Sequence, residues 1–335
     1  MSSKETILSK LHRHYTYLRR DLVAGLGHYN NFYRQSTGAR IIIYHGICES
    51  DHTRFNPIFL TKATFEAHLQ FYKKYFNVIS LDDFYAARFS NQRFNVCLTF
   101  DDGYANNHKY VLPLLEQYQV PASFFLTAIR DAGYDILWND FLGMVSKYGP
   151  ARLVYKNDEF IKERHNQYYS RRHGKRLVEI LHEGGFEEKG KMIKAFGDIV
   201  HYRHRKEDEE YWLQMTPAEI RNLSLSPFVT IGCHGYYHNN MARIDPGAAK
   251  QEMQHSKRYL EQLIGKEVKS FAFPYGSYTR MLTDQAREEG FTQLLAMDFL
   301  FPEDGLDSSM RERFTVNPFI SVNNQMQAII SRKYE

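Results

Sequence analysis

A strand that ends on two adjacent acids constrains this chain more than any other feature. The mostly apolar run 94–100 stops at Asp101 and Asp102, and Gly103 follows. Carboxylates are costly to remove from water unless something binds them, so a buried strand has little reason to end on a pair. In α/β folds the carboxyl ends of parallel strands carry the chemistry. The pair therefore predicts an active site, with its two side chains pointing in different directions.

A second apolar run, 228–232, leads into two histidines, His234 and His238. Histidines at this spacing lie on one face of a helical turn and can bind one ion. With one aspartate they make a three-ligand site that leaves positions open for water and substrate. Such a set suits zinc, nickel, cobalt or iron(II) and hydrolytic chemistry. A surface pair at the start of a helix is the alternative, but the position after a strand favours a metal site.

A third strand end completes the pattern. The run 268–273 leads into Pro274, Tyr275 and Gly276, and these residues predict a tight turn. A turn of this kind can direct a backbone N–H at a developing oxyanion. An ordinary strand exit is the alternative for this segment taken alone.

Together the three motifs resemble the polysaccharide deacetylase family, also called the NodB-homology or carbohydrate esterase 4 group. The Thr-Phe-Asp-Asp-Gly motif stands at 99–103, and Pro-Tyr-Gly stands at 274–276. The His-x-x-x-His motif stands at 234–238, with Gly235 in place of the usual serine or threonine. The resemblance runs from about residue 41 to about residue 320, apart from an insertion. It implies an α/β fold, an irregular (β/α) barrel of the NodB type with the site at the strand carboxyl ends.

The resemblance also implies a role for each site residue. Asp101 corresponds to the general base, and the backbone N–H of Tyr275 to the oxyanion donor. The ligands of a divalent metal correspond to Asp102, His234 and His238. Zinc is the expected metal, with nickel, cobalt or iron as alternatives. The implied reaction is hydrolysis of an N-acetyl or related acyl group on an amino sugar.

Two features of the family pattern are missing. Many members carry an arginine that orients the base two residues before the proline of the third motif, where this chain has Ala272. Many also carry a late Leu-x-His whose histidine is the general acid, but this chain has no histidine after His255. The candidate acid is His45, because it follows the β-branched run 39–44 at another strand exit. The alternative is a histidine that orients Asp101 or a loop.

Three more residues are expected to line the sugar site: Tyr104, Trp138 and Pro274. For Trp138, packing of the insertion against the barrel is an equally good interpretation. Cys233 lies beside His234, but alternation along the strand points it into the core rather than at the metal. The chain has three cysteines, an odd number that does not suggest a disulfide framework and fits a reducing compartment.

The composition excludes several classes of protein. With 335 residues, 43% hydrophobic and 15% aromatic, the chain can bury a large core. A net charge of +4 is small for this length and does not suggest a nucleic-acid partner. No apolar stretch approaches the ~20 residues of a membrane span, and no signal peptide is evident. We therefore expect a cytoplasmic enzyme that acts on a nucleotide-linked, lipid-linked or small glycan.

The chain is expected to form a barrel over 39–325, interrupted by a charged helical insertion over 130–215, with 326–335 as the end of a C-terminal helix. Residues 1–38 predict a basic amphipathic helical segment. Its apolar positions at helical spacing are Ile7, Leu8, Leu11, Tyr15, Leu18, Leu22 and Leu26. Packing on the barrel or on a partner subunit is one interpretation of this helix, and peripheral contact with an anionic membrane is the other.

The leading functional prediction is a metal-dependent hydrolase that deacetylates an amino sugar or glycan. A deformylase or O-deacetylase of a lipid-linked sugar is a close alternative. A catalytically silent glycan-binding barrel and a metallohydrolase of non-sugar amides are two more. The presence of both the predicted base and three predicted ligands argues against the silent barrel, because a binding protein needs neither.

Overall fold

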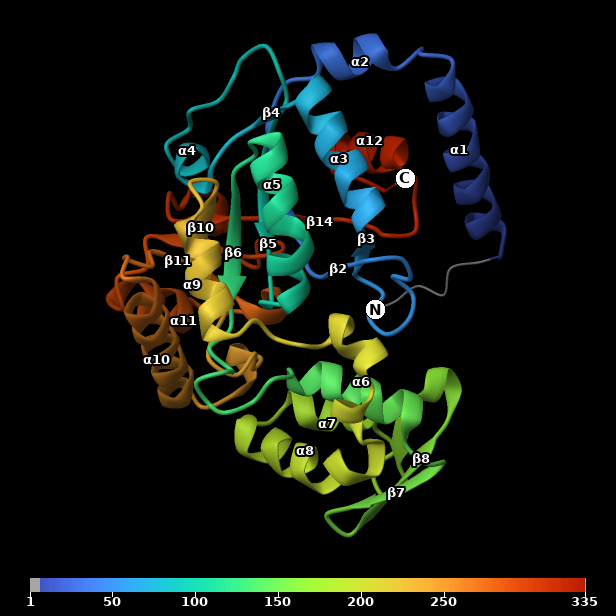
Figure 1. Ribbon diagram of the computed structural model, residues 1–335, viewed down its shortest axis with the longest axis vertical. Helices are drawn as coiled ribbons and strands as arrows, with labels where there is room; N and C mark the ends of the chain where they lie inside the picture. The colour runs from blue at the N-terminus through green and yellow to red at the C-terminus, as the bar shows by residue number, and fades with distance from the viewer. Residues whose placement is uncertain (1–6, 335) are drawn as a thin grey trace.

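A curled parallel sheet forms the centre of the computed structural model, which describes residues 7–334 (Figure 1). Its strands are β1 (Ala39–Tyr44), β4 (Asn77–Val78), β5 (Asn95–Phe100), β6 (Ala122–Leu126), β10 (Val229–Cys233), β11 (Ser270–Ala272), β12 (Gln293–Leu295), β13 (Met310–Arg311) and β14 (Phe314–Thr315). The order is β13-β12-β11-β10-β6-β5-β1-β14, with β4 also beside β5. Every pairing in this sheet is parallel, so all the carboxyl ends lie at one edge.

The two outermost strands of the sheet are neighbours along the chain. β13 pairs with β12 and β14 pairs with β1, and only Glu312 and Arg313 separate them. In a closed barrel, hydrogen bonds would join the two edge strands to each other. Here the two-residue link of the chain joins β13 to β14 instead. This geometry is the irregular (β/α) barrel that the sequence predicts, and the fold class is confirmed.

Helices surround the sheet (Figure 1). They are α3 (Lys62–Tyr75), α4 (Leu81–Tyr85), α5 (Leu112–Tyr118), α9 (Pro217–Leu225), α10 (Pro246–Ile264), α11 (Arg280–Glu288) and α12 (Val322–Ser331). Two segments differ from what their sequence patterns predict. The run 78–81 predicts a strand, but the Ser80 side chain accepts a hydrogen bond from Asp83 N and starts α4. The run 106–118 predicts a continuous α-helix, but the helix begins as a π-helical turn, η1 (Asn107–Val111).

The insertion contains more than the expected helices. It holds α6 (Trp138–Tyr148), α7 (Leu177–His182) and α8 (Phe186–Val200), and a three-stranded antiparallel sheet of β7 (Arg152–Tyr155), β8 (Asp158–Lys162) and β9 (Tyr168–Ser170). A separate apolar cluster holds these elements together and includes Trp138 and Trp212. The insertion lies on the side of the barrel toward which β6 points (Figure 1). The residue limits of the insertion and of the barrel stay predictions.

The N-terminal helix α1 (Ile7–Gly25) is followed by α2 (Asn30–Gln35) and lies against α12. Polar contacts hold it there: Asn324 Nδ2 donates to the Tyr17 carbonyl at 3.2 Å and to Asp21 Oδ1 at 2.9 Å. The predicted apolar stripe faces away from the barrel, with Leu22 73% exposed. The helix therefore packs on the barrel, as one interpretation of it predicts, but through polar side chains rather than through the apolar stripe. The side chains of Ile7 and Leu8 lie outside the described residues.

No helix within residues 7–334 combines the length and the apolar character that crossing a membrane requires.

Candidate metal and catalytic centre

The barrel brings the predicted residues of four strand ends into one cavity of about 240 Å³. His45 follows β1, the acid pair follows β5, the two histidines follow β10 and Tyr275 follows β11. The lining includes His45, Asp101, Asp102, His234, His238, Tyr275 and Arg313. Residues separated by more than 200 positions therefore meet as the parallel topology predicts.

Asp102, His234 and His238 form a buried group whose ligand atoms all lie within 4.8 Å of one another. Nε2 of His238 lies 3.1 Å from Asp102 Oδ1, and Nε2 of His234 lies 3.5 Å from the same oxygen. That oxygen is buried and accepts no hydrogen bond from the described residues. Two imidazole nitrogens and one carboxylate oxygen suit a divalent metal such as zinc, so the residues fit the ion that the family implies.

The second nitrogen of each histidine is fixed by a partner behind it. His234 Nδ1 lies 2.7 Å from the carbonyl oxygen of Ala272, and His238 Nδ1 lies 3.1 Å from the hydroxyl of Tyr275. Such partners hold the rings so that Nε2 faces the metal position. Ala272 therefore contributes through its backbone, at the position where many relatives carry an arginine.

The two histidines do not lie on a helical turn, and that prediction is wrong. The chain after β10 is irregular, and its direction changes at two left-handed residues, Gly235 (φ +79°) and His238 (φ +57°). A Cβ at position 235 would lie 2.9 Å from Met241 Cε. The left-handed backbone favours glycine at this position, and a larger residue would also have to displace the end of the Met241 side chain.

Asp101 is held by an arginine that the sequence analysis missed. Arg313 donates from Nη1 to Asp101 Oδ1 and from Nη2 to Asp101 Oδ2, each at 2.8 Å. Both side chains are buried, and Arg313 Nη1 also donates to Thr99 Oγ1 at 3.3 Å. Burial raises the pKa of Asp101, but the Arg313 guanidinium and His234 outweigh it and hold the pKa below its usual range.

Arg313 lies in the two-residue link that joins the edges of the sheet, and this explains why it was missed. In sequence it is one arginine directly before a predicted strand, which is a common surface position. Only the closure of the barrel brings it beside β5.

His45 lies in the cavity with its Nδ1 buried and without a hydrogen-bond partner among the described residues. Asn107 fixes the backbone of His45 by donating to its carbonyl oxygen at 2.9 Å. Burial lowers the pKa of His45 more than the carboxylates of Asp102 and Asp101 raise it. Across the cavity, Leu295-Ala296-Met297 has the spacing of the family's Leu-x-His, but methionine replaces the histidine and lines the wall.

Tyr275 adopts the tight turn that its neighbours predict, with φ of +60°. Its hydroxyl contacts His238, and its ring lies 4.3 Å from the ring of His182 in the insertion. The use of its backbone N–H as an oxyanion donor stays a prediction.

The three residues expected to contact the sugar lie behind the cavity wall. Tyr104 and Trp138 are fully buried, Pro274 is buried, and none of the three is part of the lining. Trp138 Nε1 donates to the carbonyl oxygen of His238 at 3.0 Å, so Trp138 packs the insertion against the metal loop. This contact favours the packing alternative for Trp138, and contact of Tyr104, Trp138 and Pro274 with a sugar stays a prediction.

All three cysteines are buried and unpaired. Cys233 belongs to the main apolar core, as alternation along its strand predicts. Burial raises the pKa of its thiol to about 12, so it stays protonated and is a poor metal ligand.

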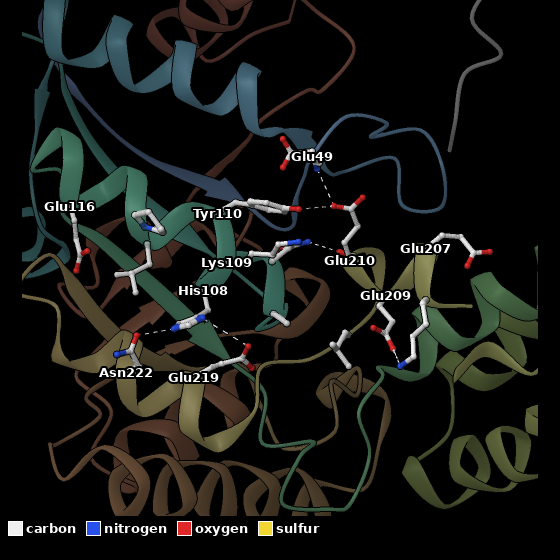
Figure 2. Close-up of a pocket in the computed structure, with 16 residues that line it drawn as sticks. Glu49, His108, Lys109, Tyr110, Glu116, Glu207, Glu209, Glu210, Glu219 and Asn222 are labelled. Carbon is white, nitrogen blue, oxygen red and sulfur yellow. Dashed lines mark hydrogen bonds and ion pairs between the residues drawn. The ribbon is translucent and has the colours of Figure 1, made fainter. Parts of the chain in front are cut away.

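A larger cavity lies elsewhere in the described structure, and its lining includes none of these residues (Figure 2). Its volume is about 780 Å³, and glutamates dominate its lining. Several of its polar side chains are paired locally, such as His108 with Asn222 and Glu219. The predicted metal ligands and catalytic residues lie instead in the smaller cavity of about 240 Å³.

The family profile described as "Polysaccharide deacetylase" matches residues 90–153 and 199–294. These ranges hold the acid pair, the two histidines and the Pro-Tyr-Gly turn. This chain belongs to the polysaccharide deacetylase family. The family is one of carbohydrate deacetylases, which are hydrolases, and membership places the chain in that enzyme class.

Solved structures agree on the fold of this deacetylase. The Streptococcus pyogenes deacetylase PplD matches with a TM-score of 0.56 and 14% identity, over 88% of this chain and 99% of that one. IcaB from Ammonifex degensii matches with a TM-score of 0.53 and 15% identity, over 88% of this chain and 98% of that one. BC0361, a polysaccharide deacetylase from Bacillus cereus, matches with a TM-score of 0.53 and 14% identity, over 88% of this chain and 69% of that one. No curated protein matches by sequence.

Proposed function

We propose that this protein is a metal-dependent hydrolase that removes an N-acetyl, or related acyl, group from an amino sugar or glycan. One observation carries the proposal: an arginine-held carboxylate, Asp101, lies beside the group Asp102, His234 and His238 in a single cavity. A glycan-binding barrel would need neither the charged pair nor the converging ligands. Ionisable groups are costly to bury unless they are paired or bind a metal, and clusters of such groups are typical of functional sites.

Each side chain has a role in the proposed mechanism. Asp102, His234 and His238 would hold the metal, which when bound polarises the acyl carbonyl and lowers the pKa of water. Asp101, kept ionised by Arg313, accepts a proton from the attacking water. The backbone N–H of Tyr275 donates to the oxygen of the carbonyl as negative charge develops on it.

His45 is the proposed general acid, which donates a proton to the leaving amine. The cavity is lined by His45 and by the two predicted metal ligands, His234 and His238. The Nδ1 of His45 has no hydrogen-bond partner among the described residues. Because burial lowers the pKa of His45, its protonated form is a stronger acid than an exposed imidazolium. Orientation of Asp101 is the alternative role.

Two finer assignments belong to the proposal. Zinc is the proposed metal, since two imidazoles and one carboxylate with open positions suit it, and nickel, cobalt or iron(II) are alternatives. Acetyl is the proposed acyl group, and the similar fold of PplD was solved in complex with acetate. Removal of a formyl or O-acetyl group would use the same residues.

The test is metal content and acetate release in one preparation. Elemental analysis of the purified protein should find close to one divalent ion per chain. The same preparation should release acetate from N-acetylglucosamine or its oligomers, and a chelator should stop the release. A protein that binds the metal and releases no acyl group from any amino sugar would contradict the proposal.

We also propose that α1 places the enzyme on an anionic membrane surface. Its exposed apolar side chains, Leu11, Tyr15, Leu18 and Leu22, form one stripe, and the exposed Leu26 follows just after the helix. Arg19 is exposed beside this stripe, and the segment as a whole is basic. Vesicles of phosphatidylcholine with phosphatidylserine should sediment the wild type more than Leu18→Gln/Leu22→Gln. Equal sedimentation of the two proteins would remove the idea, and the cytoplasmic location stays a prediction.

A further inference from the structure

The insertion contacts four consecutive residues of the metal loop, which spans residues 234–240. The contacts are the ring of Phe186 stacked on Tyr237, and hydrogen bonds from Trp138 to the His238 carbonyl, from Lys189 to Asn239 and between His182 and Asn240. Three of these four side chains of the insertion lie in 154–198, which the ranges matched by the family profile leave out. The loop follows β10 without a helix or strand of its own. Side chains of the insertion therefore help to determine its path.

Lys189 is a fully buried lysine of α8. Its Nζ donates to Oδ1 of Asn239 and, at 2.9 Å, to the carbonyl oxygen of Gly184. The same atom lies 4.6 Å from the centre of the Trp138 ring, within the range of a cation–π interaction. Lysine is almost never fully buried unless its ammonium is paired, so these contacts are what holds the side chain in place.

Asn239 connects Lys189 to Glu252 of α10, a helix of the barrel. Asn239 Nδ2 donates to Glu252 Oε1 at 2.6 Å, and the backbone N–H of Tyr237 donates to Glu252 Oε2 at 3.2 Å. Burial lowers the pKa of Lys189 to about 8, and the carboxylate of Glu252 opposes this shift. The part of the loop next to His238 is thus joined to a buried ammonium of the insertion and to a buried carboxylate of the barrel.

A second set of contacts connects the insertion to the ring of His238. The ring of His182, in α7, lies 4.3 Å from the ring of Tyr275, and the hydroxyl of Tyr275 lies 3.1 Å from His238 Nδ1. A partner at this nitrogen holds a histidine so that its other nitrogen faces the metal position. His182 therefore supports the residue that fixes the ring of His238.

We propose that Lys189 positions the metal loop, so that zinc binding and the packing of α7 and α8 on this loop stabilise each other. Lys189 is a positioning residue, because it acts on His238 through Asn239. Two events that favour the same arrangement of a loop must strengthen each other equally. The inference rests on the metal binding of the proposed function and is independent of the acyl group that the enzyme removes.

Zinc affinity is the first test. Lys189→Met keeps a side chain of similar length and removes its ammonium, so the zinc dissociation constant should rise about tenfold or more, as it does for other residues that hold metal ligands in place. Competition with a chelator measures this constant. Lys191→Met is the matched control and should bind zinc as the wild type does, because Lys191 lies on the same helix but is exposed and pairs with Glu187 at 2.6 Å. Equal dissociation constants for Lys189→Met and the wild type would overturn the inference.

Hydrogen exchange separates positioning from a merely structural role. In the wild type, zinc should slow amide exchange in α7 and α8 more than in α12, which packs against α1. In Lys189→Met, saturating zinc should slow exchange in α7 and α8 no more than in α12. A lysine that only stabilised the fold would leave the effect of zinc unchanged in this variant, and that result would overturn the inference.

Phe186→Leu is a second variant, which removes the ring stacked on Tyr237 and leaves Lys189 in place. Phe186 is half-buried, so this change tests the inference even if Lys189→Met does not fold. It should also raise the zinc dissociation constant and weaken the slowing of exchange in α7 and α8. Wild-type values of both quantities in Phe186→Leu would overturn the inference.

The inference and the proposed function can fail separately in these experiments. Zinc binding that depends on Lys189, without release of acetate or another acyl group, would contradict the proposed function alone. Acetate release by a wild type whose zinc affinity does not depend on Lys189 would overturn the inference alone. A wild type that binds no divalent metal would overturn both.

Discussion

Arg313 donates two hydrogen bonds of 2.8 Å to Asp101 across 212 residues of chain. The contact exists because the outermost strands of the sheet are joined by a two-residue link, and Arg313 lies in that link. Ionisation of the proposed base therefore depends on a buried side chain that closure of the barrel brings into contact with it.

Arg313→Met should lower the free energy of unfolding by about 3–5 kcal/mol, because it leaves the carboxylate of Asp101 buried without its cation. Asp101→Asn/Arg313→Met should lose less than the sum of the single variants, which urea unfolding would measure. The matched control is Arg203→Met, since Arg203 also makes two hydrogen bonds to a carboxylate, Asp135, but is 61% exposed. Arg203→Met should lower the free energy of unfolding by at most about 1 kcal/mol. Equal losses of unfolding free energy in Arg313→Met and Arg203→Met would show that the buried pair of Arg313 and Asp101 stabilises the protein no more than an exposed pair does.

His45→Gln should lower kcat by about 10²- to 10⁴-fold, the usual contribution of a general acid. The metal content should stay at the wild-type level, because His45 is not part of the group that converges on Asp102. Steady-state kinetics and elemental analysis of the same sample measure both quantities. Unchanged turnover with metal bound would exclude His45 as the acid.

Gly235→Ala should destabilise the protein and weaken metal binding. The left-handed backbone costs an L-residue about 1–2 kcal/mol, and the new Cβ would lie 2.9 Å from Met241 Cε. Gly133→Ala is the matched control, since its φ is +82° but no atom lies within 4 Å of the added Cβ. Calorimetry should show a larger loss at position 235, and only that variant should bind the metal more weakly. An equal loss of stability in Gly235→Ala and Gly133→Ala would mean that the contact with Met241 is unimportant.

His68 should make the protein acid-sensitive. It is buried in α3, its Nδ1 lies 3.0 Å from the hydroxyl of Tyr44, and burial lowers its pKa to about 3. The unfolded chain takes up this proton near pH 6.5, so the free energy of unfolding should fall as pH drops from about 6.5 toward 3, by up to roughly 1.4 kcal/mol per unit.

His68→Asn keeps a polar group for Tyr44 but cannot take up the proton. Between pH 6.5 and pH 5 it should therefore lose less stability than the wild type in urea unfolding. Parallel curves for the two proteins would show that His68 does not contribute to the pH dependence.

The sequence predicts the parts of this structure that depend on local patterns. Runs of apolar residues that end on Asp101, His45 and Tyr275 identify strand ends, and parallel strands must place those ends at one edge. The apolar stripes of α3, α10 and α11 likewise predict their helices to within a few residues.

Contacts made by closure of the fold were beyond this kind of prediction. No local pattern shows that Arg313 reaches Asp101, because the link it occupies is defined only by the order of the strands. The loop around His238 depends on left-handed residues, so a helical spacing of histidines was misleading there. Tyr104 and Trp138 were assigned to the sugar from their residue types, whereas their burial is decided by how the insertion packs.

The central claim is that Asp101 and Asp102 have separate functions, and one pair of variants tests it most directly. Metal content and acetate release should be measured together for Asp101→Asn and His238→Ala. We expect Asp101→Asn to keep its metal and lose turnover, and His238→Ala to lose both. An active Asp101→Asn enzyme, or full metal content in His238→Ala, would contradict the account.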